Sequence, residues 1–122
     1  MNHNAKSIRP FIGSKDFTVS QNFYRDLGFE ENTISTNMSY FRTEAFGFYL
    51  QDAYVKDWID NTMIFMEVDD VTRFWNELIT LDLTTKYKDV KLVPIRTLDW
   101  GSECFVHDPC GVLWHVGEFF IK

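Results

Sequence analysis

Ser7-Ile-Arg-Pro-Phe-Ile-Gly-Ser-Lys-Asp16 and Thr62-Met-Ile-Phe-Met-Glu-Val-Asp69-Asp70 are the two stretches that decide the fold, because each reads as a short apolar strand that ends on an acidic residue. A helix-like segment follows both. The first segment carries Phe23, Tyr24 and Leu27, and the second carries Phe74, Trp75 and Leu78, at three- and four-residue spacings. The chain is therefore predicted to contain one small unit twice, with a seam between the copies where a small ligand could sit.

The residues at the predicted helix ends and in the connector support this doubling. Asp16 and Asp70 are predicted N-caps, and Gly28 stands where the first helix should end in a left-handed residue. A polar connector that accommodates one helical turn separates the copies. The predicted strands cover residues 8–13, three short runs within 29–51, and then 63–68, 88–98, 102–107 and 112–119.

The repeated order of strand, helix and three strands predicts the fold class. We expect an α+β fold of two tandem βαβββ modules, whose mixed sheets curve around a shared cavity and carry one helix on the outer face of each. The whole of residues 1–122 is expected to be one domain. Module one covers about residues 6–52, the connector 53–61 and module two about 62–120.

Composition excludes several functions. A net charge of −6 and a pI of about 4.9 argue against a basic surface for nucleic acid or anionic lipid. No apolar run is long enough to cross a bilayer, and the N-terminus does not resemble a signal peptide, so we expect a soluble cytoplasmic protein. Its two cysteines, Cys104 and Cys110, are then free thiols. Aromatic residues make up 17% of the chain, which is enough for a core and a ring-lined cleft.

The C-terminal sequence Asp99-Trp-Gly-Ser-Glu-Cys-Phe-Val-His-Asp-Pro-Cys-Gly-Val-Leu-Trp-His115, combined with Asp16, Phe23-Tyr24 and Leu27-Gly28-Phe29, carries a resemblance over essentially the whole chain. It resembles the vicinal oxygen chelate superfamily, the group of glyoxalases, bleomycin-resistance proteins and extradiol dioxygenases. Within it the chain is most similar to the bleomycin-resistance proteins, through Arg9-Pro10, Asp60-Asn61-Thr62 and Trp100-Gly101. The resemblance implies the same doubled βαβββ module.

The resemblance also allows a test for a metal, because the metal enzymes of this group take ligands from the first and last strand of each module. The corresponding residues here are Arg9, Met63, Tyr49 or Gln51, and His115. His115 alone is a good ligand type, whereas catalytic sites usually need three protein ligands. We therefore expect no metal and no other cofactor, as in the bleomycin-resistance proteins, which are binding proteins.

Several residues are candidates for ligand contact. Trp100 matches a tryptophan that stacks on flat heteroaromatic rings in the bleomycin-resistance proteins, although it could instead close the cavity as a rim aromatic. Arg9 could pair with an anionic group of a ligand or with Glu67, Glu103 or Glu118 of the chain itself. Tyr40, Phe46 and Trp58 lie where the antibiotic-binding relatives bring rings to a dimer crevice, and packing is the alternative for each. Met63 is expected to face the cavity from its strand.

A hairpin turn at Asp108-Pro-Cys-Gly111 would place Cys104 directly opposite His115 on one face of the sheet. A thiol beside an imidazole could form a nucleophilic pair, but no orienting residue is visible and the resembled family uses no such pair. We expect a packed thiol beside a hydrogen-bonded imidazole, with both residues close to the ligand.

The resulting prediction is a metal-free binding protein that captures a partly aromatic small molecule in a crevice associated with a homodimer. It has no nucleic-acid or membrane partner. Two alternatives stay open at this point. One is a metal-dependent lyase, isomerase, dioxygenase or thiol transferase that uses His115 with Gln51 and a third ligand; the other is a dimeric interaction module without a small ligand.

Overall fold

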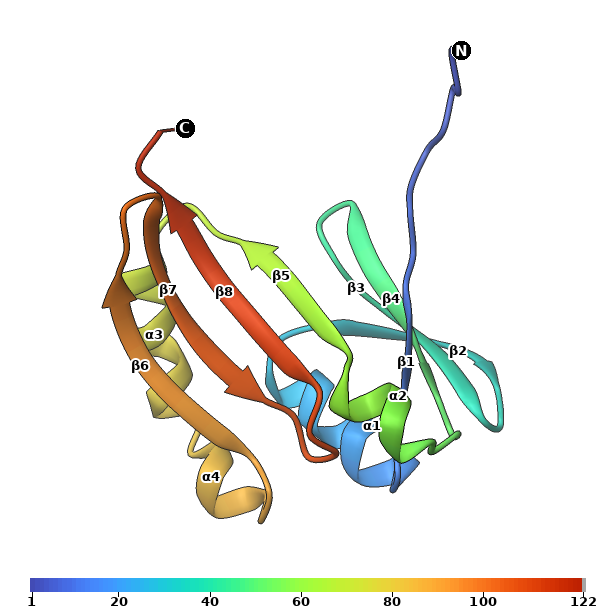
Figure 1. The fold of residues 1–122 in the computed structure, drawn as a ribbon. Coiled ribbons are helices and arrows are strands. Elements are labelled where there is room, and N and C mark those ends of the chain that lie inside the picture. The colour runs from blue at the N-terminus through green and yellow to red at the C-terminus, as the bar shows by residue number, and fades with distance from the viewer. Residues whose placement is uncertain (122) are drawn as a thin grey trace.

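Two four-stranded sheets of the same design form the frame of the protein (Figure 1). The structure is a computed structural model and describes residues 1–121. The first sheet has the order β1-β4-β3-β2 and the second has the order β5-β8-β7-β6. In each sheet the first pair of strands is parallel and the other pairs are antiparallel. The strands are β1 (Phe11–Gly13), β2 (Glu30–Ser35), β3 (Met38–Thr43), β4 (Phe46–Gln51), β5 (Met63–Glu67), β6 (Lys91–Thr97), β7 (Gly101–His107) and β8 (Leu113–Phe119).

The two long helices begin at the predicted caps. The Asp16 side chain accepts a hydrogen bond from the backbone N–H of Val19 at the start of α1 (Phe17–Asp26), and Asp70 accepts one from Arg73 at the start of α3 (Val71–Thr80). Gly28 has a φ of 105°, the left-handed conformation that ends a helix at low cost. The predicted α+β class, with one long helix in each βαβββ repeat, is confirmed.

Two short helices lie outside the repeated pattern. The connector contains α2 (Lys56–Asp60), as the sequence allowed. The helix α4 (Leu83–Lys86) was not predicted, and it follows Asp82, which has a left-handed φ of 57°. Leu83 is buried and anchors this extra turn. None of the helices within residues 1–121 is long and apolar enough to cross a membrane.

The pleat of each sheet separates a buried face from an open face. In the second sheet, Ile64, Cys104, Val106, Trp114 and Val116 share the face that packs beneath α3 and the core. The residues between them in sequence point to the other face, since side chains alternate along a strand. The first sheet repeats this arrangement, so each module leaves one sheet face open.

The side chain of Tyr24 joins the two modules at the centre of the core. Tyr24 lies on α1 and is fully buried among Phe29, Phe48 and Trp114. Its hydroxyl donates to Asp108 Oδ2 at 2.6 Å and accepts from Trp114 Nε1 at 3.0 Å. Because Asp108 and Trp114 belong to the second module, this hydroxyl ties α1 to the opposite half of the chain.

Candidate ligand-binding site

The open face of the second sheet carries a cluster of aromatic rings. Phe65 from β5 lies 5.9 Å from the ring of Trp100 and 5.6 Å from that of Phe119, and the Trp100 and Phe119 rings are 5.2 Å apart. Gly117 lies beneath them, where an added Cβ would come within 2.6 Å of Phe65 and 3.2 Å of Trp100. We call Phe65, Trp100 and Phe119 the ring platform; it is a partly exposed surface on which a flat molecule could stack.

His115 borders the ring platform and is held in one orientation. Its Nδ1 lies 2.8 Å from Oε1 of Glu103, and its ring packs edge-on against Phe105 with a centroid distance of 4.7 Å. Glu103 is almost fully buried, and Arg96 approaches its other oxygen at 3.7 Å. A carboxylate accepts hydrogen bonds, so Nδ1 of His115 is the donor to Glu103 and Nε2 is left for a ligand.

Met63 belongs to the same open face. It stands two residues before Phe65 on β5, pairs in register with Leu113 on β8, and is 63% exposed. The structure therefore brings three of the predicted contact residues, Met63, Trp100 and His115, to one face of one sheet.

The open face of the first sheet carries a second group, in which a cation lies on tyrosines. The Arg9 guanidinium stacks 4.2 Å from the centroid of Tyr40, and its Nη1 donates to the Tyr49 hydroxyl at 3.0 Å. Phe11 stacks on Tyr49 at 4.7 Å. The hydrogen bond that Arg9 donates to Tyr49 raises the pKa of Arg9 above its ordinary value. Arg9 and Tyr40 are thus neighbours, and the cation packs on rings instead of pairing with Glu67, Glu103 or Glu118.

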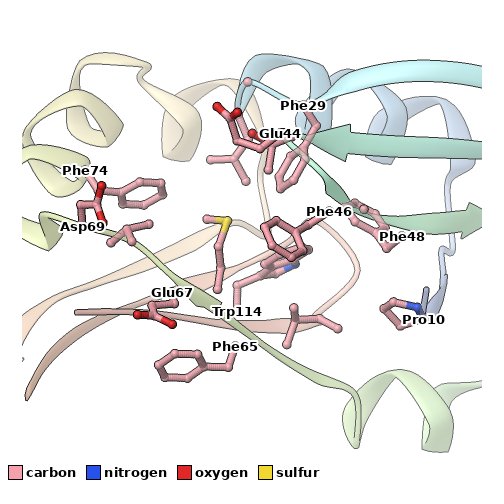
Figure 2. A pocket seen from close by; sticks show the side chains of 17 residues that line it. Pro10, Phe29, Glu44, Phe46, Phe48, Phe65, Glu67, Asp69, Phe74 and Trp114 are labelled. Carbon is pink, nitrogen blue, oxygen red and sulfur yellow. The ribbon is translucent and has the colours of Figure 1, made fainter. Parts of the chain in front are cut away.

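A pocket of about 710 Å³ lies between the modules (Figure 2). Phe46 stands at this pocket, on the face of β4 that also carries Phe48, and not with the ring platform or Arg9. Trp58, on α2, is 72% exposed and is not among the described residues that line the pocket or form the two ring clusters. The residues that line the pocket are Pro10, Leu27, Gly28, Phe29, Thr43, Glu44, Phe46, Gly47, Phe48, Ile64, Phe65, Met66, Glu67, Val68, Asp69, Phe74 and Trp114.

The predicted pairing of Cys104 with His115 is wrong. The observed register pairs Phe105 with His115 and Cys104 with Val116, so Cys104 lies on the buried face away from the ring platform. Burial raises the pKa of the Cys104 thiol to about 11. The loop between β7 and β8 has five residues instead of four, because the buried Asp108 carboxylate accepts the backbone N–H groups of Cys110, Gly111 and Val112. Because side chains alternate along a strand, one added loop residue moves each β7 side chain to the opposite face of the sheet from the one expected relative to His115.

The positions that hold a metal in the resembled enzymes do not provide a suitable set of donors. The position expected in the first strand of module one falls on Arg9, which lies two residues before β1, and that of module two falls on Met63, the first residue of β5. Tyr49 already accepts a hydrogen bond from Arg9, which leaves His115 as the one strong ligand type. Within residues 1–121, no group of three or more His, Cys, Asp or Glu side chains could hold an ion.

Sequence reasoning did not single out Phe65, Phe119, Glu103 or Tyr49 as parts of these clusters. The alternation of residues along β5 and β8 was the available signal, because it places Phe65 and His115 on the same face once the strands are paired. Glu103 could not be assigned, since its contact with His115 depends on the register across a loop.

Comparison with known proteins adds information at the level of structure. No protein-family model and no curated protein matches the chain. Among solved structures, the bleomycin resistance determinant encoded on the transposon Tn5 superposes with a TM-score of 0.81 at 16% identity, covering 96% of this chain and 100% of the other.

Two further structures extend this comparison. The bleomycin-binding protein from bleomycin-producing Streptomyces verticillus, complexed with copper(II)-bleomycin, gives a TM-score of 0.78 at 21% identity and covers 95% of this chain and 97% of that one. Lactoylglutathione lyase from Agrobacterium tumefaciens gives 0.70 at 17% identity, with 95% and 96% covered. At these identities the likeness concerns the fold, which this chain shares with the bleomycin-binding and bleomycin resistance proteins.

Proposed function

We propose that the protein binds a small, partly aromatic molecule without covalent chemistry, and that it does so without a catalytic metal. The ring platform beside His115 is the observation that carries this proposal. It offers three rings within 6 Å of one another and one oriented imidazole on a partly exposed surface. Such a surface recognises a ligand through a flat contact and one directed hydrogen bond.

The arrangement favours binding over catalysis. The two carboxylate oxygens of Glu103 contact His115 and Arg96. Glu103 therefore orients the imidazole and is not free to transfer protons to a ligand. The four positions where the resembled enzymes bind metal supply one imidazole, one thioether, one phenol and one guanidinium. A cation at Arg9 opposes a divalent ion at that position. These residues support a metal-free site.

We further propose that the working form is a homodimer with its ligand crevices at or near the subunit interface. Both open sheet faces leave large apolar side chains in solvent, with Phe11 57% and Met63 63% exposed. Large apolar side chains exposed on the open face of a sheet are typical of an interaction site. A second chain could cover one open face with the other and so enclose a ligand between the ring platform of one subunit and Arg9 and Tyr40 of its partner.

We propose sequestration of an antibiotic as an example of such a function, since two of the superposed structures are a bleomycin-binding protein and a bleomycin resistance determinant. We propose the cytoplasm as its location, because the composition and the two free thiols fit a reducing compartment.

The test is a thermal-shift screen with bleomycin and other planar heteroaromatic compounds, followed by a fluorescence titration of each compound that stabilises the protein. A ligand at a hundred times its dissociation constant adds about 2.7 kcal/mol of apparent stability. Trp100→Ala should weaken binding roughly fivefold, since stacking contributes about 1 kcal/mol.

Trp58→Ala is the matched control, because it removes an equally large exposed ring that lies outside the ring platform. Equal losses in the two variants would contradict the proposed site. Stoichiometric, tightly bound metal in the purified protein would support a superfamily enzyme instead, and a dimer that no compound stabilises would support a pure interaction module.

A further inference from the structure

We infer that the pocket between the modules is a second ligand site, separate from the ring platform, and that it takes an organic cation with an aromatic body. The pocket has a volume of about 710 Å³, which lies within the range of small-molecule sites in proteins. The inference concerns a different cavity from the one in the proposed function, so each can fail without the other.

The floor of the pocket is a fixed aromatic surface. Phe29, Phe48 and Trp114 contact one another with centroid distances of 5.3 to 5.6 Å, and each is less than a tenth exposed. Tyr24 packs behind all three rings. Because these rings are already held by the core, a ligand that touches the small part of them left exposed does not have to order them, which lowers the cost of binding.

The charge around the pocket has one sign. Figure 2 shows Glu44 on one side of the pocket and Asp69 on another, whereas Glu67 lies beside Phe65. Glu44 comes from the turn between β3 and β4 of the first module, and Asp69 follows β5 in the second. Glu67 alternates with Met66 along β5 and therefore points to the face of the ring platform. Among the described residues that line the pocket there is no lysine, arginine or histidine. The carboxylates and the negative face of the exposed Phe46 ring both favour a cation, and both oppose an anion.

The pocket and the ring platform lie on different faces of the second sheet. Ile64, Met66 and Trp114 line the pocket from the face that carries Cys104 and Val116, and Trp100 and His115 stand on the opposite face. Phe65, on the edge strand β5, borders both. The affinity of a compound bound in the pocket should therefore not depend on Trp100. Substitution of Trp100 thus distinguishes the pocket from the ring platform.

Rhodamine 6G, a planar lipophilic cation, is a suitable probe, and 8-anilinonaphthalene-1-sulfonate is its anionic counterpart. Fluorescence anisotropy of rhodamine 6G with the full chain should show saturable binding that weakens with added salt, while the anion competes poorly. The double variant Glu44→Gln with Asp69→Asn should bind rhodamine 6G roughly fivefold more weakly, since partly exposed charges each contribute modestly.

The matched control is Asp57→Asn with Asp89→Asn, which removes two exposed carboxylates away from the pocket and should leave the affinity unchanged. Phe46→Ala should weaken binding by a similar factor to the Glu44→Gln, Asp69→Asn double variant, and because Phe46 is 74% exposed the variant should fold normally. Trp100→Ala should have no effect on rhodamine 6G.

Three results would overturn the inference. The first is no rhodamine 6G binding at all. The second is binding that is lost in Trp100→Ala but kept in the Glu44→Gln, Asp69→Asn double variant, which would place the cation on the ring platform and leave the proposed function intact. The third is binding that falls as the protein concentration rises through dimerisation, which would show that a second copy of the chain covers the pocket.

Discussion

Replacing Tyr24 with Phe tests the physical link on which the placement of both sites depends. The substitution removes one oxygen atom and keeps the ring that packs against Phe48 and Trp114. Two buried groups then lose a partner at once: Asp108 Oδ2, which accepts from the hydroxyl at 2.6 Å, and Trp114 Nε1, which donates to it at 3.0 Å.

The expected magnitude follows from these two contacts. A hydrogen bond to a charged group contributes about 1.5–3 kcal/mol, and a buried donor left without a partner costs about 1–3 kcal/mol. Tyr24, Asp108 and Trp114 are all buried, so little water can replace the lost oxygen. We expect the free energy of unfolding of Tyr24→Phe to fall by about 3–4 kcal/mol.

The assay is urea unfolding followed by far-ultraviolet circular dichroism, at one protein concentration for all variants, since dimerisation would shift the midpoint. Tyr54→Phe is the control, because Tyr54 is 44% exposed and the loss of its hydroxyl should change stability by less than about 0.5 kcal/mol. In a Trp114→Phe background the Tyr24→Phe cost should shrink by about 1 kcal/mol, because the indole N–H is no longer there to be stranded. A loss below about 1 kcal/mol in the single variant, or no such coupling, would refute this account of the junction.

Three further predictions follow from the site. Ellman's reagent at pH 8 should label Cys110 quickly and Cys104 only after unfolding. The reason is that Cys104 is 1% exposed and the pKa of its thiol is raised to about 11. Rapid labelling of both thiols in the native protein would contradict the observed register. The raised pKa of Cys104 stabilises the fold below about pH 9, and this contribution of roughly 2–3 kcal/mol is lost as the pH rises to about 11. The loss should be smaller in Cys104→Val, as measured by urea unfolding at both pH values. Gly117→Ala should displace Phe65 and Trp100, whose atoms lie 2.6 and 3.2 Å from the new Cβ, and weaken a stacked ligand roughly fivefold in the fluorescence titration while Trp58→Ala does not.

Local sequence patterns were sufficient to predict the repeat and its long helices. Asp16 and Asp70 can act as caps with contacts three residues away, and the apolar spacing after them needs no information from the rest of the chain. The short helix α4 was not predictable in this way. It depends on a left-handed Asp82 and on a buried place for Leu83 against the core, and both are set by tertiary packing.

The register of β7 and β8 shows why part of the site could not be predicted. Asp108-Pro-Cys-Gly111 reads as a four-residue turn, which would put Cys104 beside His115. In the structure Asp108 also accepts the N–H of Val112 and receives a hydrogen bond from Tyr24, a residue 84 positions earlier. That distant donor stabilises a buried carboxylate and with it the longer loop. The identity of the residue beside His115 was therefore decided by a contact between modules.

The repeat also explains how one frame can carry two different open faces. Tyr49 in module one is the counterpart of His115 in module two, because Tyr49 pairs with Phe11 of β1 as His115 pairs with Phe65 of β5. Tyr40 is likewise the counterpart of Phe105, because they pair with Tyr49 and His115 from the next strand. In module one the counterpart of the His115 imidazole is a phenol that accepts from Arg9, so this face presents a cation and tyrosine rings. In module two a buried Glu103 orients the imidazole and leaves one nitrogen for a partner. A twofold arrangement of two chains that sets one face against the other would offer a ligand a cation on one side and a hydrogen-bond acceptor with flat rings on the other. Selectivity for a molecule with an acceptor and a donor at its opposite ends would then follow from the divergence of the two modules.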